Sequence, residues 1–296
     1  MKIAVIHYRS KPTLSSSELL YAIEELGHMP IYIKIHELDA HLLNGSIIVE
    51  KFNEPIQIDG GIIRSIGYSL STDMLARRIG VLEALASYAT LINDPSTIMY
   101  TRDKWRSLLR LAKEGLPVPE TIITENPYTA KSFCEKCKRV VFKPLMGSLG
   151  LGSTLVTDPD IAFHITRSLA NMGITSYYQE YLEKPGFDFR VFVVGDQVIG
   201  AMKRVVSSGW KTNIARGARG VKITEEEYPE VFKLALKATQ ILGLDYAGVD
   251  IAFDKQRDKY YILEVNAYPQ WQGLKTATGV NVAKHIVSYL INKIRR

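Results

Sequence analysis

The order of strands and helices changes at Pro119, and this change constrains the fold more than any other feature of the sequence. Before it, residues 3–8 have the pattern of a short buried strand, residues 15–27 show helical spacing, and residues 31–38 have a second strand pattern. This β-α-β order predicts a parallel sheet with a right-handed crossover. After Pro119, eight strand patterns follow, mostly across short turns. The sequence therefore predicts an α/β part of roughly 100 residues and then an α+β part with antiparallel hairpins.

Further elements are predicted from periodicity and capping signals. The first helix has Ser15 to Ser17 as candidate N-caps and Gly27 as its C-cap. The others are strand material at 47–58, helices at 73–89 and 100–114 with a strand and turn between them, and later helices at 159–172, 226–242 and 282–293.

Composition excludes several classes of protein. Of the 296 residues, 46% are hydrophobic and 23% are charged, as in ordinary globular proteins, so a disordered, collagen-like or disulfide-scaffold protein is excluded. No apolar run approaches the ~18 residues that span a membrane. His7 interrupts the apolar residues Ile3 to Ile6 too early for a secretory signal. We therefore expect a cytoplasmic protein with no membrane partner.

The net charge of +6 is scattered and forms no block of five or more like charges. A site for single-stranded nucleic acid would combine a basic stripe with interleaved aromatic side chains. Tyr177, Tyr178 and Tyr181 lie in an apolar strand pattern instead. The charge therefore favours small anionic ligands, and we expect no nucleic-acid partner.

The two cysteines, Cys134 and Cys137, form a C-x-x-C pair. Such a pair suits one face of an amphipathic helix, a redox pair or half of a zinc site. Zinc would need two further ligands, and the sequence has neither a second cysteine pair nor an H-x-x-x-H. We favour a structural helix, and a disulfide stays open.

A glycine-rich segment follows the strand pattern that ends at Lys143. Its glycines have the order G-x-x-G-x-G and lead into another strand, which fits neither a Rossmann nor a P-loop motif. A glycine hairpin can fold its backbone N–H groups over phosphates, and we expect residues 147–152 to be mobile without nucleotide and ordered with it. The alternative is a plain hairpin with an exposed lysine. The candidate phosphate-binding residues are Lys143, Gly147, Ser148, Gly150 and Gly152.

Two acidic residues lie on neighbouring strand patterns, Asp250 before the turn at 254–259 and Glu264 after it. An antiparallel hairpin would place Asp250 opposite or near Glu264, with Asn266 on the same face as Glu264. Two adjacent carboxylates repel each other, so replacing one is expected to raise the stability of the metal-free protein. An all-oxygen set of this kind suits Mg²⁺, with Mn²⁺ as the alternative. Otherwise the two acids simply face outward.

Basic and amide side chains lie between the glycine segment and this hairpin. Arginine forks match phosphate and carboxylate oxygens, and glycines at 217 and 220 would let the backbone approach a ligand. Taken singly, each arginine is more often a surface residue. The candidates are Arg190, Lys203, Arg204, Asn213, Arg216 and Arg219.

The segment 179–183 ends an apolar strand and leads into Lys-Pro-Gly. Tyr181 and Leu182 could hold a flat ring, while backbone groups read its edge and Glu183 binds ribose hydroxyls. The candidate nucleotide-binding residues here are Gln179, Glu180, Tyr181, Leu182 and Glu183.

The order of these parts resembles the ATP-grasp superfamily, and most closely the RimK-like α-L-glutamate ligases, over nearly the whole chain. The segment RDKWRSLLRLAKEGLPVPET matches that family before its central lobe, and Lys104 matches its first ATP lysine. The segments GIIRSIG and ARRIGVLEAL are similar to archaeal members that glutamylate coenzymes. NAYPQWQGLKTATG departs from the ribosomal-protein modifiers and looks more like tetrahydromethanopterin or F420 glutamate ligases.

The resemblance implies a pre-ATP-grasp α/β domain at residues 1–99 and a two-lobed ATP-grasp domain at 100–296, with lobes at about 100–182 and 183–296. ATP would phosphorylate a substrate carboxylate, and the amine of L-glutamate would attack the acyl phosphate. It also implies roles: Asp250, Glu264 and Asn266 for Mg²⁺; Lys104 and Lys143 for phosphates; Arg190, Arg204 and Asn213 for the transferred phosphoryl group; Arg216 for a substrate carboxylate. A non-catalytic nucleotide-binding module would lack part of that metal set.

The resemblance and the charge predict an acceptor that is a small anionic coenzyme of the pterin or F420 type. Trp271 could stack on its ring, or it packs into the interface between lobes. The alternatives are a protein C-terminus, as in ribosomal-protein modification, and an amino-acid-biosynthesis ligase. We also expect a homo-oligomer.

Overall fold

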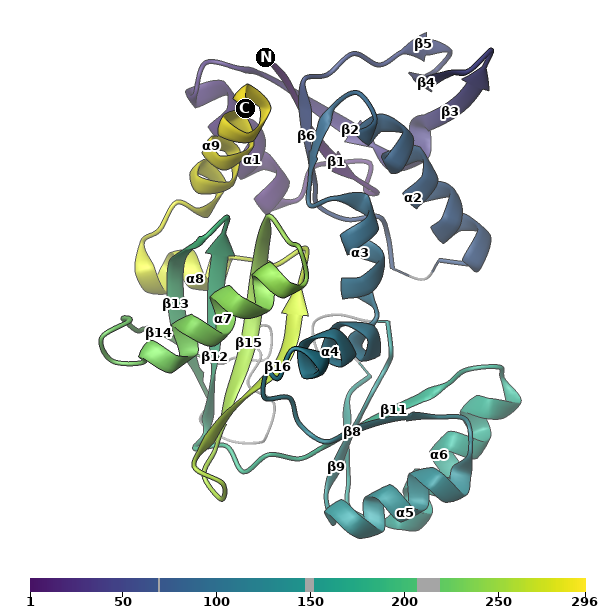
Figure 1. Cartoon of the computed structure of the whole chain (residues 1–296), viewed down its shortest axis with the longest axis vertical. Coiled ribbons are helices and arrows are strands. Elements are labelled where there is room, and N and C mark those ends of the chain that lie inside the picture. Colours follow the sequence, from purple (N-terminus) through teal and green to yellow (C-terminus); the bar gives the residue numbers. More distant parts are fainter. Residues whose placement is uncertain (69, 147–151, 207–218) are drawn as a thin grey trace.

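The computed structural model describes residues 1–68, 70–146, 152–206 and 219–296. Figure 1 shows three parts along the longest axis. The N-terminal sheet lies at one end with both chain termini, a five-stranded sheet lies in the middle, and a smaller sheet with α5 and α6 lies at the other end. None of the helices in the described ranges is long and apolar enough to cross a bilayer.

The N-terminal sheet is parallel, as predicted, with strand order β2-β1-β6-β7. Its strands are β1 (Lys2–His7), β2 (Met29–Lys34), β6 (Gly60–Ile63) and β7 (Thr90–Ile92), and its helices are α1 (Leu14–Glu25) and α2 (Thr72–Ala86). The N-cap of α1 is Thr13, whose hydroxyl accepts a hydrogen bond from the amide of Ser16, so the helix begins earlier than predicted.

The predicted strand at 31–38 is wrong in its second half. After β2 the chain makes a single 3₁₀ turn (Ile35–Glu37) and enters a hairpin. Asn44 and Gly45, both at positive φ, form the tight turn that an Asn-Gly pair favours. The resulting small sheet has β3 (Leu38–Leu43), β4 (Ser46–Lys51) and β5 (Glu54–Pro55).

The predicted helix at 100–114 is two helices, α3 (Pro95–Arg102) and α4 (Lys104–Lys113). Asp103 between them has an extended backbone, and its carboxylate caps α4 by accepting from the amide of Arg106 at 3.1 Å. This break makes Lys104 the first residue of α4. The predicted domain boundary at residue 99 falls inside α3 and stays a prediction.

The smaller sheet has the order β10-β9-β11-β8. Its strands are β8 (Thr121–Thr124), β9 (Val140–Lys143), β10 (Thr154–Val156) and β11 (Ser176–Glu180). One face packs on α5 (Pro127–Cys137) and α6 (Pro159–Asn171) around Phe133, Val140 and Tyr178. Cys134 and Cys137 lie on α5 as free thiols, which confirms the predicted helix.

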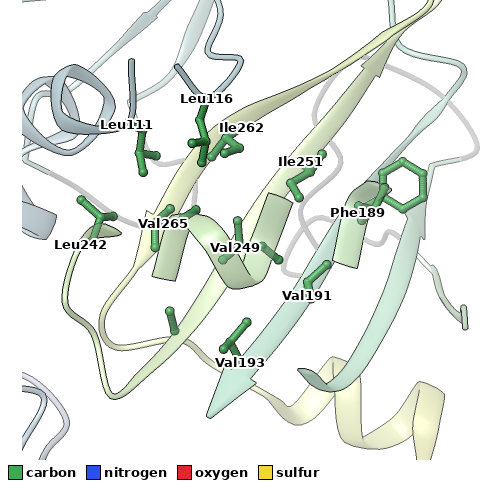
Figure 2. Close-up of a cluster of buried hydrophobic side chains, with 14 of the residues drawn as sticks. Leu111, Leu116, Phe189, Val191, Val193, Leu242, Val249, Ile251, Ile262 and Val265 are labelled. Carbon is green, nitrogen blue, oxygen red and sulfur yellow. The ribbon is translucent and has the colours of Figure 1, made fainter. Parts of the chain in front are cut away.

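The five-stranded sheet is antiparallel, with order β14-β13-β12-β15-β16. Its strands are β12 (Phe187–Val194), β13 (Gln197–Val205), β14 (Arg219–Lys222), β15 (Tyr246–Asp254) and β16 (Lys259–Asn266). The helices of this part of the chain are α7 (Pro229–Ile241), α8 (Gln272–Thr278) and α9 (Val282–Arg295), of which α9 packs on α1. One face packs on α4 and α7 in the core of Figure 2, which includes Leu111, Val191, Val249, Ile251 and Val265. The even-numbered residues of β12 therefore lie on the other face.

Trp271 is fully buried where the N-terminal part meets the five-stranded sheet. Its indole N–H donates to Glu18 on α1 at 2.5 Å, and its ring meets the Phe192 ring edge-on. The chain turns toward α1 after β16, so the side chain enters the shared core with Leu19 and Ile286. The predicted stacking of Trp271 on an acceptor ring is wrong, and the alternative of interface packing is confirmed.

A substitution at Asn93 tests the contact between the N-terminal part and the five-stranded sheet. Its buried amide donates to the carbonyls of Tyr246 and Ala267 and accepts from the amides of Asp245 and Tyr246, all within 3.0 Å. Asn93→Ala would leave four backbone groups without these partners, so we expect a loss of about 3 kcal/mol or more in the free energy of unfolding. Urea unfolding measures it. The exposed Asn171→Ala is the control and should change stability by less than about 0.5 kcal/mol; equal effects would contradict the assigned role.

Candidate active site

The β15–β16 hairpin brings the two predicted metal carboxylates together. Asp250 pairs with Glu264, and Gly248 pairs with Asn266 two residues along. Side chains of directly paired residues lie on the same face of a sheet, and so do side chains two residues apart on one strand. Asp250, Glu264 and Asn266 therefore lie on one side of the sheet. The predicted pairing is confirmed. All three lie on the face opposite to α7.

Asp250 is only 6% exposed and lies between two guanidinium groups. Arg190 donates to both of its carboxylate oxygens, at 2.5 and 3.0 Å, and Arg204 approaches it at 3.2 Å. Burial alone would raise the pKa of Asp250, but the charges and hydrogen bonds of Arg190 and Arg204 outweigh it and lower the pKa. The predicted repulsion between acids is therefore wrong as a description of this site. We therefore expect that replacing Asp250 removes the carboxylate partner of Arg190 and one of the two carboxylates at Arg204, and lowers stability rather than raising it.

Arg204 is itself held by Asp188, which the sequence analysis missed. The pairing of β12 with β13 sets Asp188 opposite Arg204, and two hydrogen bonds of 2.7 and 2.8 Å join the guanidinium to the carboxylate. Burial works against the charge of Arg204, but Asp188 and Asp250 reverse that effect and raise its pKa. The four side chains form one buried series of alternating charge: Asp188, Arg204, Asp250, Arg190.

Two predicted phosphate-binding lysines lie close to Glu264. The ammonium of Lys104, at the start of α4, is 4.0 Å from the Glu264 carboxylate. Lys143, at the end of β9, donates to the Gln179 side chain at 2.6 Å. Burial lowers the pKa of Lys143 to about 8, and the charges of Lys104 and Lys184 add to this while Glu264 opposes it. Lys184, also not predicted, therefore belongs to the same electrostatic environment.

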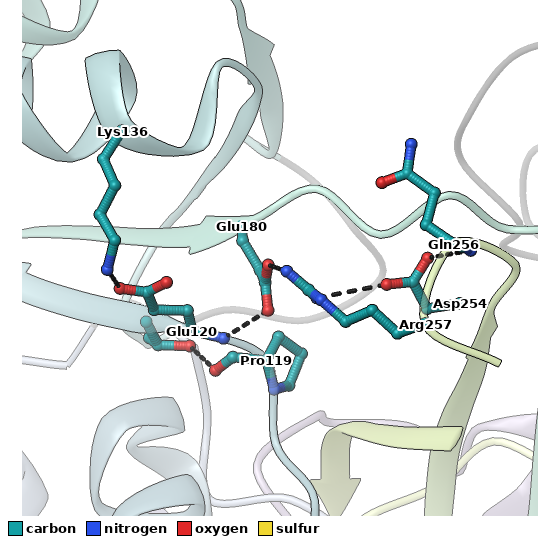
Figure 3. A network of polar contacts seen from close by, with 8 residues as sticks. Pro119, Glu120, Lys136, Glu180, Asp254, Gln256 and Arg257 are labelled. Atoms are coloured by element: carbon teal, nitrogen blue, oxygen red, sulfur yellow. Dashed lines mark hydrogen bonds and ion pairs between the residues drawn. The ribbon is translucent and has the colours of Figure 1, made fainter. Parts of the chain in front are cut away.

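The predicted nucleotide segment 179–183 is divided between two sides. Gln179 lies on the side of Lys143, whereas the next side chain, Glu180, points the other way. Figure 3 shows that Glu180 accepts from the amide of Glu120 at 2.8 Å and from Arg257, on the β15–β16 turn, at 2.6 Å. Leu182 is buried against Ala252.

Arg139 holds two other members of this segment. Its guanidinium pairs with the carboxylate of Glu183 and lies 4.5 Å from the centre of the Tyr181 ring. A cavity of about 390 Å³ borders this network, with Lys136 and Arg257 among its lining residues. Glu183 is therefore paired with Arg139, and its binding of ribose hydroxyls stays a prediction.

Several predicted site residues lie outside the described part of the chain: Gly147, Ser148, Gly150, Asn213 and Arg216. Gly152 is described and has φ of +76°, and a Cβ there would come within 2.8 Å of Pro144. Only glycine suits that position. The mobility predicted for residues 147–152 stays a prediction.

The donor set fits a divalent cation that shares its coordination with a nucleotide. In the described ranges no three His, Cys, Asp or Glu side chains come together as a complete metal site. Two carboxylates and one amide on one face suit Mg²⁺ or Mn²⁺, which would take their remaining ligands from phosphates and water. The pair of arginines on Asp250 shows that this carboxylate already favours a cationic partner.

Comparisons with known proteins agree with this geometry. The RimK-like ATP-grasp domain matches residues 101–290. The tetrahydromethanopterin:α-L-glutamate ligase of Methanocaldococcus jannaschii is 32% identical over 88% of this chain and 92% of its own length. A probable α-L-glutamate ligase of Mannheimia succiniciproducens is 31% identical over 93% of this chain and 87% of its own.

Solved structures show the same fold. The ATP-grasp ligase PsnB with its minimal precursor superposes with a TM-score of 0.75 at 24% identity, covering 98% of both chains. The macrocyclase MdnC from Microcystis aeruginosa, bound to its precursor peptide, gives 0.76 at 17% identity and covers 99% of this chain and all of its own. The fold and site thus define an ATP-dependent ligase of the ATP-grasp class. The chain belongs to the RimK-like ATP-grasp family.

The depressed pKa of Lys143 gives a pH-dependent prediction. If its ammonium binds a phosphate, nucleotide binding raises its pKa from about 8 in the ligand-free protein. Binding of ADP with Mg²⁺ should then take up about half a proton at pH 8 and weaken as the pH rises further. Calorimetric titrations in two buffers of different ionisation enthalpy measure this uptake. Lys143→Arg stays charged and should bind without uptake; no uptake by the wild-type protein would contradict the assignment.

Proposed function

We propose that this protein uses ATP to join L-glutamate, through an amide bond, to the carboxylate of a small anionic acceptor. The observation that carries this proposal is the pairing of Asp250 with Glu264 across one hairpin, with Lys104 and Lys143 beside them. Acids that share a face with Asn266 and adjoin two lysines suit a nucleotide polyphosphate and its cation. The names of the relatives support glutamate as the amine donor.

The reaction proceeds through an acyl phosphate. An acceptor carboxylate oxygen attacks the γ-phosphorus of ATP and ADP leaves; the glutamate amine then attacks the acyl carbon, and inorganic phosphate departs as the amide forms. A divalent cation held by Asp250, Glu264 and Asn266 would neutralise charge on the β- and γ-phosphates. The protein supplies positioning and charge rather than a nucleophile.

Each charged residue has a proposed part in this reaction. Lys104 and Lys143 hold phosphate oxygens. Because a cation on Asp250 competes with its ion pairs, we expect Arg190 to turn toward the transferred phosphoryl group. Arg204 stays fixed by Asp188 and supplies a constant positive potential. Asn213 and Arg216 keep their predicted roles at the phosphoryl group and at a substrate carboxylate.

The proposed acceptor is a coenzyme of the pterin or deazaflavin type. The likeness to an archaeal tetrahydromethanopterin ligase over 88% of the chain supports it, as does the net charge of +6. Trp271 does not support a ring-bearing acceptor, because its side chain is fully buried. A peptide C-terminus and an amino-acid precursor are the competing acceptors, and a homo-oligomer stays a prediction.

An ADP-release screen with L-glutamate tests this function. Candidate acceptors are a tetrahydromethanopterin-type coenzyme, an F420-type coenzyme, a glutamate-ending peptide and an amino-acid precursor. We expect release to require both glutamate and one coenzyme, and mass spectrometry should find a product heavier by one glutamyl residue. Replacing Mg²⁺ by Mn²⁺ tests the alternative metal. Release with only the peptide would overturn the coenzyme assignment.

The metal assignment gives a separate prediction. Asp250→Asn and Glu264→Gln should each lower kcat by about 100-fold or more, because the phosphate charge loses its cation. Asp250→Asn should also cost about 3 kcal/mol in the free energy of unfolding, since Arg190 and Arg204 lose their shared carboxylate.

The matched control is Asp258→Asn, at the exposed tip of the same hairpin, which should keep full activity. Activity is read by ADP release and stability by urea unfolding. Full activity of either active-site variant would remove that residue from the proposed metal site. A rise in stability of Asp250→Asn would show that repulsion, not ion pairing, dominates there.

A further inference from the structure

Four arginines and a histidine gather at one edge of the N-terminal sheet without an acidic partner. They are Arg9, Arg64, Arg78, Arg102 and His7. None of the four arginines forms an ion pair with a carboxylate in the described ranges, although Arg64 and Arg78 are buried. Some arginines elsewhere in the described ranges have such partners, as Arg77 has Asp39. Buried cations without counter-ions are costly, so this edge favours an anion.

This edge lies at a position where α/β sheets commonly bind ligands. His7 ends β1 and Arg64 follows β6, and these two strands are neighbours. From β1 the chain crosses to β2 on one side, whereas β6 lies on its other side. Ligands bind beyond the carboxyl ends of the strands at such a switch point.

Backbone carbonyls take only part of the hydrogen-bonding capacity of these arginines. Arg64 donates to Pro269 at 2.8 Å, Arg102 donates to Gly67 at 2.8 Å, and Arg78 donates to Ile66. Gly67 has φ of +106°, and a Cβ there would lie 2.5 Å from the Arg78 guanidinium. Within the described ranges, three buried polar atoms at this edge have no hydrogen-bond partner: Nε of Arg64, Nε of Arg102 and the hydroxyl of Tyr268.

The field at this edge is positive enough to affect a neighbouring base. Burial first, and then the charges of Arg64 and Arg9, lower the pKa of His7 to about 4. Its imidazole is therefore neutral at physiological pH. Its Nδ1 accepts a hydrogen bond from the amide of Arg9 at 2.9 Å, which fixes the start of the next loop.

That loop is open to a ligand. Residues 9–13 line a cavity of about 400 Å³, and Arg9 and Lys11 are exposed there. The hydroxyl of Tyr32 donates to the carbonyls of Arg9 and Lys11 and holds the loop in place. The rings of Tyr8 and Tyr68 meet edge-on at 5.6 Å. Tyr68 is 53% exposed, so an apolar ring surface adjoins the cations.

This cationic edge continues into the candidate active site. Tyr268 is two residues beyond Asn266, and Arg102 is two residues before Lys104, so each pair of Cα atoms lies within about 7 Å. The carbonyl of Pro269 accepts from Arg64. The ring of Pro269 and the guanidinium of Arg190 both lie close to Gly248. A ligand on the edge can therefore extend a carboxylate toward Asp250 and Glu264.

We propose that this edge is the acceptor-binding site, and that it takes a small molecule with a flat ring and an anionic group in addition to the reacting carboxylate. Arg9 and Lys11 bind the anion, and Tyr8 and Tyr68 contact the ring. Arg64 acts as a positioning residue, because its guanidinium lies 4.4 Å from the Trp271 ring and joins the two parts of the chain. The identification of this edge as the acceptor-binding site rests on the proposed function.

Folic acid is the probe, since it joins a pterin ring to two carboxylates. Calorimetry would titrate it into protein saturated with ADP and Mg²⁺, and tetraglutamate would serve as a peptide probe. The Arg9→Gln/Lys11→Gln double variant should weaken folic acid binding at least about 10-fold, because two charged contacts are lost. Lys2→Gln, at the opposite end of β1, is the matched control and should bind like the wild type.

ADP affinity and melting temperature should stay unchanged in both variants, which separates lost contacts from misfolding. Tyr68→Leu should weaken folic acid and leave the affinity for ADP alone. Equal folic acid affinity in the double variant and the wild type would overturn the proposal, as would binding of tetraglutamate without folic acid. If folic acid binding depends on Arg9 and Lys11 but no acceptor yields ADP with glutamate, this site stands and the proposed function fails.

Discussion

The site depends on a carboxylate that is buried between two guanidinium groups. Asp250 lies on β15, and its partners come from the next two strands of the sheet in order, Arg190 from β12 and Arg204 from β13. Water cannot solvate these charges, so each requires the others to remain ionised. Their alternation with Asp188 holds the strands in a register that also places Glu264 and Asn266. The same face becomes apolar further along, where Phe192 meets Trp271.

If Asp250 binds a cation as proposed, its ion pairs with arginine have two opposite effects. They keep the carboxylate deprotonated and oriented before a ligand arrives, which reduces the reorganisation on binding. They also compete with the cation, which would have to displace the ion pair of 2.5 Å to Arg190. The lysines behave differently. Lys143 has a neutral amide partner, and its burial lowers its pKa to about 8 despite the nearby charge of Glu264.

Much of this arrangement is predictable from sequence, and the failures have physical reasons. The turn at 254–259 fixes the register from Asp254 and Lys259 up to Ile251 and Ile262. A bulge between Asp250 and Ile251 then sets Asp250 opposite Glu264 instead of Leu263, and the length of the turn does not show this bulge. Asp188 was missed since its partner lies across a different hairpin, and counting outward from the turn near Gly195 would pair it with Lys203; the register shift between Phe192 and Val193 moves the partner to Arg204. Trp271 was misassigned because local sequence does not show which distant helix covers a side chain. Arg64 and Arg102 belong to a site that exists only when β1, β6 and β16 are brought together.

The extended residue between α3 and α4 has a consequence for substrate binding. Asp103 separates two helices that carry Arg102, on the cationic edge, and Lys104, beside Glu264. A ligand that shifts either side chain moves a backbone shared by both. Two ligands that are coupled through this shared backbone change each other's affinity by the same factor, whichever binds first. The break at Asp103 thus provides a route for reciprocal coupling between acceptor and nucleotide.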